Sequence, residues 1–158
     1  MTTETKTQPD TDREIVVSRI IEGPRKLVFD AFTDVTHLAK WWVPDGSSLT
    51  TRTFEFRAGG VWDSTIRRAG GGEIPNYIVW KEIAPPERIV WLYYGMGKDD
   101  PNAVTTILTF ADRGATTEAT LRLVFVSKEQ RDQAAKYHAV KGAQGALDQL
   151  AAYVEGGR

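Results

Sequence analysis

The chain has 158 residues, no cysteine, and 20 Lys plus Arg against 21 Asp plus Glu, so it is nearly neutral and long enough for one domain with a sizeable core. The charge balance, with no dense basic run, argues against a nucleic-acid partner, and the missing cysteines exclude disulfides and thiolate metal sites. No apolar segment approaches the roughly 18 residues that span a bilayer, and no secretory signal is present, so we expect a cytoplasmic protein without a membrane partner. Residues 1–12 are expected to form a disordered tail ahead of one domain over residues 13–157.

The first elements are a strand and two short helices. Glu14 to Ile21 is short and rich in β-branched residues, which favours a strand. Pro24 then suits the first position of a helix, because its missing N–H would be unpaired there, and helical spacing continues to about Thr33. A second helix is predicted from Asp34, a residue suited to the N-cap, to Trp42.

Six further strands are predicted after Ser47, separated by turn residues. The glycine-rich stretches "RAGGVW" and "AGGGE" are interpreted as hairpin turns, because neither leads into a helix with a lysine that could hold a phosphate. The six expected strands are Leu49 to Arg57, Val61 to Arg68, Tyr77 to Ile83, Arg88 to Tyr94, Val104 to Phe110 and Thr116 to Val126.

The chain ends in an alanine-rich segment of helical periodicity. Ser127 with Gln130 has the form of a capping box, and the pattern predicts one long amphipathic helix to the C-terminus. Strands joined by short turns form a twisted antiparallel sheet, whose concave face is the surface that could cover such a helix. We therefore predict an α+β fold in which about seven antiparallel strands wrap around a long C-terminal helix.

Five stretches in this order resemble the START-like, or SRPBCC, helix-grip superfamily (START/Bet v-like), and within it the AHSA-like branch, homologues of the activator of the heat-shock chaperone ATPase. They run from about Arg19 to Val154 and are "RIIEGPRKLVFDAFTD", "LAKWWVPDG", "FEFRAGGVWD", "EIAPPERIVW" and "KGAQGALDQLAAYV". The resemblance implies a cavity between the sheet and the last helix. Two departures are Glu55, where the branch often has aspartate, and Gly142-Ala143, where it often has Gly-Trp. The second departure removes a large ring, so the resemblance implies a roomier or differently shaped cavity.

Aromatic residues of the strands are the first candidates for a ligand site. Trp62, Trp80 and Trp91 each come from a different predicted strand and could converge on one concave face, with Tyr93 on the same face as Trp91. Aromatic walls with few polar groups are typical of small-molecule pockets, but aromatic residues also fill cores. Both interpretations stay open, because the inward face depends on the strand register.

Trp41 and Trp42 are adjacent on the predicted second helix and so point about 100° apart. Trp42 lies four residues after Leu38, and we expect these two to pack against the first strand and the last helix. Trp41 would then close the mouth of the cavity and contact the ligand.

On the last helix, Tyr137, Lys141 and Gln144 are the remaining candidates for ligand contact. Gln144 lies on the apolar stripe, where a polar residue either extends its head group to solvent at the helix edge or reaches into a cavity. The same alternatives apply to Lys141, which flanks the stripe.

Chemistry beyond binding has little support in the sequence. His37 and His138 have no further ligand at metal-binding spacing, so neither a metal nor another cofactor is expected. No Gly-x-Ser-x-Gly elbow occurs. Asp63 and Glu82 fall within strands, where they either face solvent or, if buried, become candidate general bases.

Three functions remain. The leading one is a binding protein for a small apolar or aromatic ligand in the cavity. The second is an enzyme that uses the same cavity, since START-like folds include hydrolases and cyclases. The third, a chaperone-associated interaction protein, ranks last because the chain contains one such domain only. A homodimer is left open.

Overall fold

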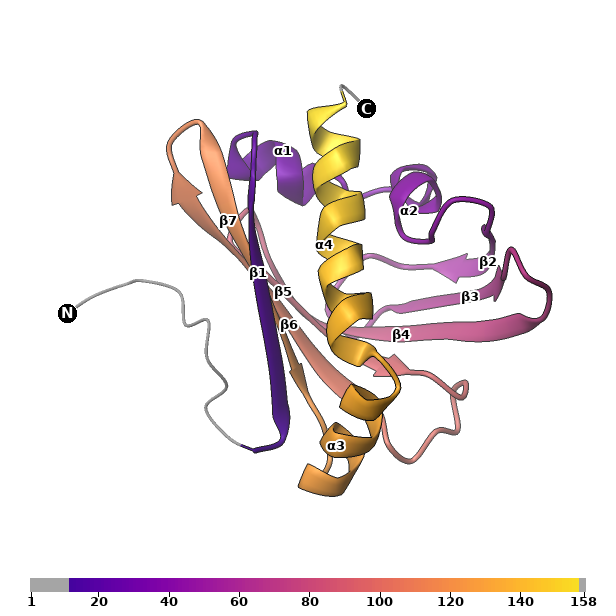
Figure 1. Ribbon diagram of the computed structural model, residues 1–158. Coiled ribbons are helices and arrows are strands. Elements are labelled where there is room, and N and C mark those ends of the chain that lie inside the picture. The colour runs from indigo at the N-terminus through magenta and orange to yellow at the C-terminus, as the bar shows by residue number, and fades with distance from the viewer. Residues whose placement is uncertain (1–11, 157–158) are drawn as a thin grey trace.

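The computed structural model describes residues 12–156, and the predicted tail lies outside them except for its last residue. Within these described residues the chain runs through seven strands and four helices (Figure 1). Their bounds are β1 (Glu14–Ile21), α1 (Arg25–Asp30), α2 (Val35–Trp41), β2 (Ser48–Phe54), β3 (Val61–Arg67), β4 (Glu73–Ala84), β5 (Arg88–Tyr94), β6 (Val104–Arg113), β7 (Thr116–Val124), α3 (Lys128–Lys136) and α4 (Ala139–Glu155).

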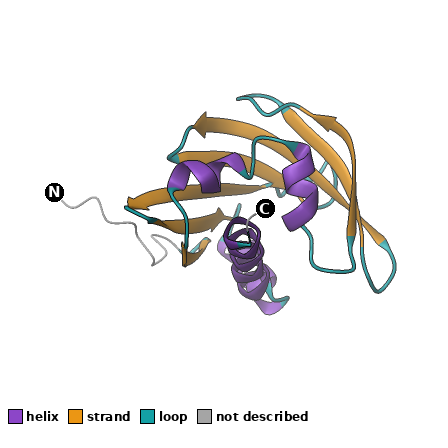
Figure 2. Cartoon of the chain, turned by 90° about the horizontal axis from the view of Figure 1, so that it is seen from above, coloured by secondary structure: helices purple, strands orange, loops and turns teal. Residues whose placement is uncertain are grey.

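The strands form one antiparallel sheet in the order β1-β7-β6-β5-β4-β3-β2. Consecutive strands from β2 to β7 are neighbours, while β1 crosses back to pair with β7. Figure 2 shows the sheet as an arc with α4 almost end-on at its concave side. The predicted α+β helix-grip fold, with two short helices after the first strand, is confirmed.

β4 is longer than predicted, because it begins at Glu73 and includes Pro75. Pro75 lies opposite Thr65 of β3, whereas the pairing of β4 with β5 begins only at Tyr77. The proline therefore sits where β4 has a neighbour on one side only, and its missing N–H breaks no ladder. This extension carries Ile74 and Asn76 to the region below α4, where they matter for the site.

Two predicted helix starts are confirmed by their caps. The Asp34 side chain accepts a hydrogen bond from the Thr36 N–H at 2.8 Å. The Ser127 hydroxyl accepts one from the Gln130 N–H at 3.1 Å. Each cap satisfies a backbone donor that the helix itself cannot pair.

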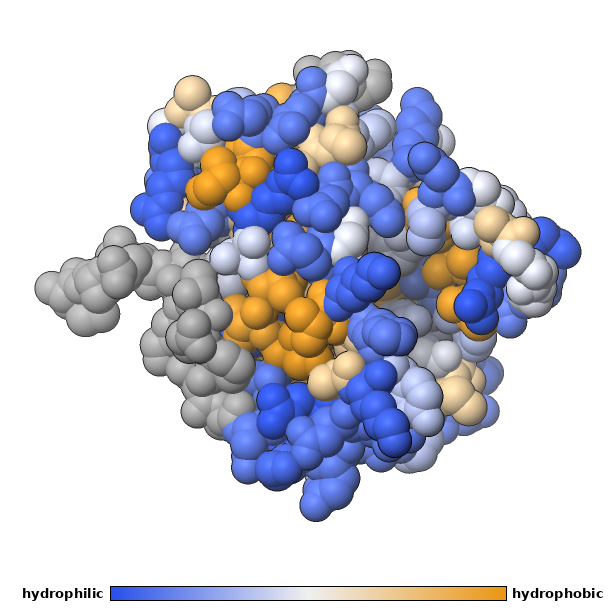
Figure 3. Space-filling model, in the orientation of Figure 1, coloured by the Kyte–Doolittle hydropathy of each residue, from blue (hydrophilic) through white to orange (hydrophobic). Residues whose placement is uncertain are grey.

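The prediction of one continuous C-terminal helix is wrong. The segment divides into α3 and α4 at Tyr137 and His138, and His138 adopts a left-handed conformation with φ of 72°. A left-handed residue cannot continue a right-handed helix, so the axis changes direction there. α3 buries none of its residues, and its surface is strongly hydrophilic (Figure 3).

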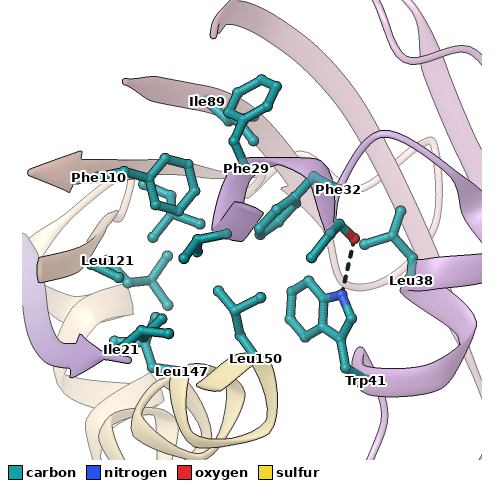
Figure 4. Close-up of a cluster of buried hydrophobic side chains, with 14 of the residues drawn as sticks. Ile21, Phe29, Phe32, Leu38, Trp41, Ile89, Phe110, Leu121, Leu147 and Leu150 are labelled. Carbon is teal, nitrogen blue, oxygen red and sulfur yellow. Dashed lines mark hydrogen bonds between the residues drawn. The ribbon is translucent and has the colours of Figure 1, made fainter. Parts of the chain in front are cut away.

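α4 holds the centre of the core through small and aliphatic residues on its inward face: Ala143, Leu147, Leu150, Ala151 and Val154. Figure 4 shows Leu147 and Leu150 reaching toward Ile21, Phe110 and Leu121 of the sheet. Phe29 and Phe32, from α1 and the residues after it, close the other side, and both are almost completely buried. Burial of such side chains is the main stabilising contribution, at about 1.5–3 kcal/mol each.

Polar contacts fix α4 over the sheet and against α2. Gln149 Nε2 donates to the Trp41 carbonyl oxygen at 2.7 Å, and His37 Nδ1 and the Tyr153 hydroxyl are hydrogen-bonded at 2.6 Å. Arg19 of β1 pairs with Asp148 at 2.7 Å. The Arg19–Asp148 pair is exposed and contributes little energy, whereas the two contacts between α4 and α2 are partly buried. None of the helices in residues 12–156 combines the length and apolar character needed to cross a membrane.

Candidate ligand cavity

A cavity of about 750 Å³ lies between the N-terminal half of α4 and the concave face of the sheet. Its volume falls in the range of small-molecule sites, which is roughly 300–1,000 Å³. On the sheet side its walls are Ile66, Ile74, Asn76, Trp91, Tyr93, Thr106, Leu121 and Leu123. On the helix side they are Tyr137, Ala139, Gly142, Ala143 and Ala146, and Trp42 and Arg68 complete the lining.

The space exists because α4 presents small residues toward the sheet. Ala139, Gly142, Ala143 and Ala146 recur at intervals of three and four residues, which places them on one face of the helix. Apart from its two chain neighbours and the adjacent backbone of α4 itself, no heavy atom lies within 4 Å of a Cβ atom added to Gly142. Both residues of the Gly142-Ala143 departure therefore border the cavity, where a larger ring would occupy it.

A short polar network anchors Trp42 in the cavity wall. Trp42 Nε1 donates to the side-chain oxygen of Asn76 at 3.0 Å, and Asn76 Nδ2 donates to the Ser64 hydroxyl at 2.8 Å. The Ser64 hydroxyl in turn donates to the Asn76 carbonyl oxygen at 3.1 Å. Ser64 and Asn76 are opposite each other in the β3–β4 pair and almost completely buried, so the network satisfies groups that water cannot reach.

The predicted roles of the paired tryptophans are reversed. Trp41 is the core residue, only 4% exposed, and its Nε1 donates to the Ala31 carbonyl oxygen at 3.0 Å (Figure 4). Trp42 is half-buried and lines the cavity. The cause is that Trp41, three residues after Leu38, shares its inward face, whereas Trp42 turns toward β3 and β4. Trp41 is absent from the cavity lining and borders a smaller apolar pocket of about 40 Å³, which shares Trp42, Trp91, Leu121 and Ala146 with the cavity.

The three strand tryptophans face inward together, but only Trp91 lines the cavity. Trp62 and Trp80 are fully buried behind it, with parallel rings whose centroids are 6.3 Å apart. The ring centroids of Trp80 and Trp91 are 5.7 Å apart. The ring centroid of Trp42 lies 4.9 Å from that of Trp62 and 6.0 Å from that of Trp91. Trp42, Trp62, Trp80 and Trp91 therefore form one aromatic cluster in which each ring packs against two others, and this cluster supports the cavity wall.

Tyr93 lines the cavity beside Trp91, on the same face of β5, as the alternation predicts. Burial raises the pKa of its phenol, and the carboxylate of Asp100 raises it further. Both causes disfavour the phenolate, which would be a charge in an apolar site and near another negative charge. Tyr93 therefore stays neutral at ordinary pH and can donate its O–H to a ligand.

The helix candidates occupy different positions. Tyr137 lines the cavity at its outer end and is 67% exposed. Lys141 borders an outer groove of about 710 Å³, and this groove and the cavity have Trp42, Arg68, Gly142 and Ala146 in common. Gln144 lies on the outer side of α4, where its Nε2 donates to Asp148 at 3.4 Å, so it is not a cavity residue.

Three polar lining residues were not predicted: Arg68, Asn76 and Thr106. The alternation of inward and outward residues along the strands already indicates Arg68 and Asn76. Arg68 continues the series Trp62, Ser64, Ile66 by two residues, and Asn76 precedes Ile78 and Trp80 in the same way. Thr106 occupies the corresponding inward position on β6 and is 3% exposed.

The strand carboxylates stay outside the cavity. Asp63 pairs with Arg52 at 2.7 Å and Glu82 with Arg88 at 2.9 Å, and neither acid is buried. Among residues 12–156, no group of three or more His, Asp or Glu side chains could hold a metal ion. The polar chemistry that faces the cavity is therefore hydrogen bonding by Asn76, Thr106 and Tyr93, with Arg68 as the cation at its rim.

Solved structures with this architecture come from several bacteria. A protein from Rhodobacter sphaeroides superimposes with a TM-score of 0.82 at 17% identity, over 96% of this chain and 98% of its own. One from Nitrosomonas europaea has a TM-score of 0.81 at 20% identity, with coverage of 93% and 97%. One from Rhizobium loti is 28% identical, with a TM-score of 0.68 and coverage of 89% and 95%. The first two show the common fold alone.

No curated protein matches the chain in sequence. The sequence model of the family described as "Activator of Hsp90 ATPase homolog 1-like protein" matches residues 22–155, which include α1 to α4 and strands β2 to β7. The structure adds the helix-grip fold that the resemblance implies. The chain therefore belongs to the Activator of Hsp90 ATPase homolog 1-like family.

Proposed function

We propose that the protein binds a small, largely apolar or aromatic molecule in the cavity beneath α4. The observation that carries this proposal is a space of about 750 Å³ with walls of aromatic, aliphatic and small side chains. A fold does not fix a function, so the proposal depends on the site and not on family membership.

The polar groups of the cavity support binding over turnover. Asn76 is already engaged with Trp42 and Ser64, so its part is to hold the wall in place. Tyr93 and Thr106 are neutral hydroxyl groups that can orient a ligand. Of the residues that line the inner cavity, only Arg68 carries a full charge at neutral pH, and it stands at the rim.

Tryptophan fluorescence and thermal unfolding test the proposal directly. Trp42 and Trp91 line the cavity, so ligands from a panel of apolar and aromatic compounds should shift or quench the emission. A ligand that binds the folded state alone should also raise the melting temperature by mass action.

The matched control is Ala143→Trp, which places a large ring in the cavity and should abolish both effects. Failure of every compound in a broad panel to change either signal of the wild-type protein at high micromolar concentration would contradict the proposal.

A further inference from the structure

Two cations from separate elements border one groove beside the cavity. Arg68 directly follows β3, and Lys141 lies in the first turn of α4. Both border the outer groove, which shares Trp42, Arg68, Gly142 and Ala146 with the cavity, and both side chains are exposed. His138, at the break before α4, borders the same groove.

Neither cation is neutralised by the described part of the chain. Arg67, the direct neighbour of Arg68, forms an ion pair with Glu73 at 2.6 Å on the other face of the hairpin. For Arg68 and Lys141, residues 12–156 provide no ion-pair partner. Two unpaired cations at one opening produce a positive local potential.

The acidic residues nearby do not cancel this potential within the groove. No carboxylate is among the described residues that line the cavity or the outer groove. Asp45 follows the lining residue Pro44 in the chain but is not itself part of the lining. Asp148 borders a neighbouring groove together with Lys141, and its carboxylate pairs with Arg19 at 2.7 Å. Asp100 acts on Tyr93 from the loop after β5, and its oxygens accept hydrogen bonds from the N–H groups of Met96 and Asn102.

From this arrangement we propose that the ligand is an amphipathic organic anion, such as a carboxylate with an apolar ring or tail. The inference rests on the proposed function, because the apolar body of the ligand would occupy the cavity. Its anionic group would lie between Arg68 and Lys141 in the outer groove. The guanidinium offers paired N–H donors to a planar carboxylate, and the ammonium adds a second positive charge.

A matched pair of fluorescent probes separates the two parts of this recognition. Anilinonaphthalene sulfonate and phenylnaphthylamine share one aromatic body and differ in the sulfonate. The wild-type protein should bind the sulfonate more tightly, and added salt should weaken that preference by screening the cations.

The variants are Arg68→Gln, Lys141→Gln and the double variant, with Arg67→Gln as the matched control. We expect each single change to weaken sulfonate binding by about fivefold and the double change by more than about tenfold, in line with exposed ion pairs. Binding of phenylnaphthylamine should stay unchanged in all of them, and Arg67→Gln should behave as the wild type.

Four results would overturn the inference. Equal affinity of the wild-type protein for both probes, or an unchanged sulfonate affinity in the double variant, would remove the anion site and leave the proposed function intact. If neither probe binds the wild-type protein, or if both bind Ala143→Trp as tightly as they bind the wild type, the proposed function and the inference are contradicted together.

Discussion

Trp42 Nε1 donates a hydrogen bond to the side-chain oxygen of Asn76, 3.0 Å away, and so joins the end of α2 to the first half of β4 across the cavity wall. Asn76 is 1% exposed, and its own amide donates to Ser64. The position of a large aromatic side chain at the site therefore depends on one buried amide.

The variant Asn76→Ala should destabilise the protein by about 1–3 kcal/mol, because it leaves Trp42 Nε1 and the Ser64 hydroxyl without their partner. Urea denaturation gives the free energy of unfolding. Lys81→Ala, an exposed position on the same strand, should change it by less than about 0.5 kcal/mol. Equal stability of the two variants would mean that the network contributes nothing.

The two adjacent tryptophans should respond differently to truncation. Trp41→Ala removes a core ring and a hydrogen bond to Ala31, and we expect a loss of about 3–5 kcal/mol. Trp42→Ala should lose less stability but change the ligand response, because its ring lines the cavity. Chemical denaturation of both variants, with ligand titration of Trp42→Ala, checks this. A larger loss for Trp42→Ala would contradict the assignment.

The cavity should accept a large side chain at Ala143. Ala143→Trp should destabilise the protein by less than the roughly 1–3 kcal/mol expected for overpacking, since the ring can enter open space. Ala151→Trp, two turns further along α4 at a fully buried position, should lose at least that amount. Thermal unfolding of the two variants side by side gives the comparison. The opposite order would show that the space beneath Ala143 is closed.

The neutral form of Tyr93 predicts a specific loss of stability in alkali. Below the ordinary tyrosine pKa of about 10, both folded and unfolded chains keep the proton, and this group adds no pH dependence. Above it, the unfolded chain loses the proton first because the folded pKa is raised, so stability falls until the pH passes the folded pKa.

Tyr93→Phe should remove this part of the alkaline loss. The free energy of unfolding of wild type and variant, compared by urea denaturation between about pH 8 and pH 11, should converge or cross as pH rises. A constant difference over the whole range would show that the folded pKa of Tyr93 equals the unfolded one.

Strand alternation predicted the sheet well, because the inward and outward sides differ clearly in chemistry. Trp62, Ser64 and Ile66 share a face by spacing alone, and the structure turns that face toward α4. Arg68 follows by the same rule. Since the predicted strand runs from Val61 to Arg68, the same alternation places its last residue on the cavity face.

Helical periodicity gave wrong predictions where the same spacing fits two different arrangements of the side chains. Trp41 and Trp42 lie three and four residues after Leu38, and both spacings share a helix face, so only the tertiary contacts of α2 decide between them. The break at His138 had no glycine to indicate it, and Tyr137 and Val140 fit the stripe of a continuous helix although both are exposed. The same misplaced stripe explains why Gln144 was expected to face the cavity, although it lies on the outer side of α4.

The position of β2 at the edge of the sheet affects how copies of the protein can contact one another. β2 is the last strand at one edge of the sheet, where an unpaired backbone could template the strand of a second molecule. Its register with β3 shifts between Thr51 and Thr53, and Arg52 at the irregularity pairs with Asp63. A kinked, charged edge resists strand addition, so the sheet can stay open on this side to form the grip without favouring aggregation.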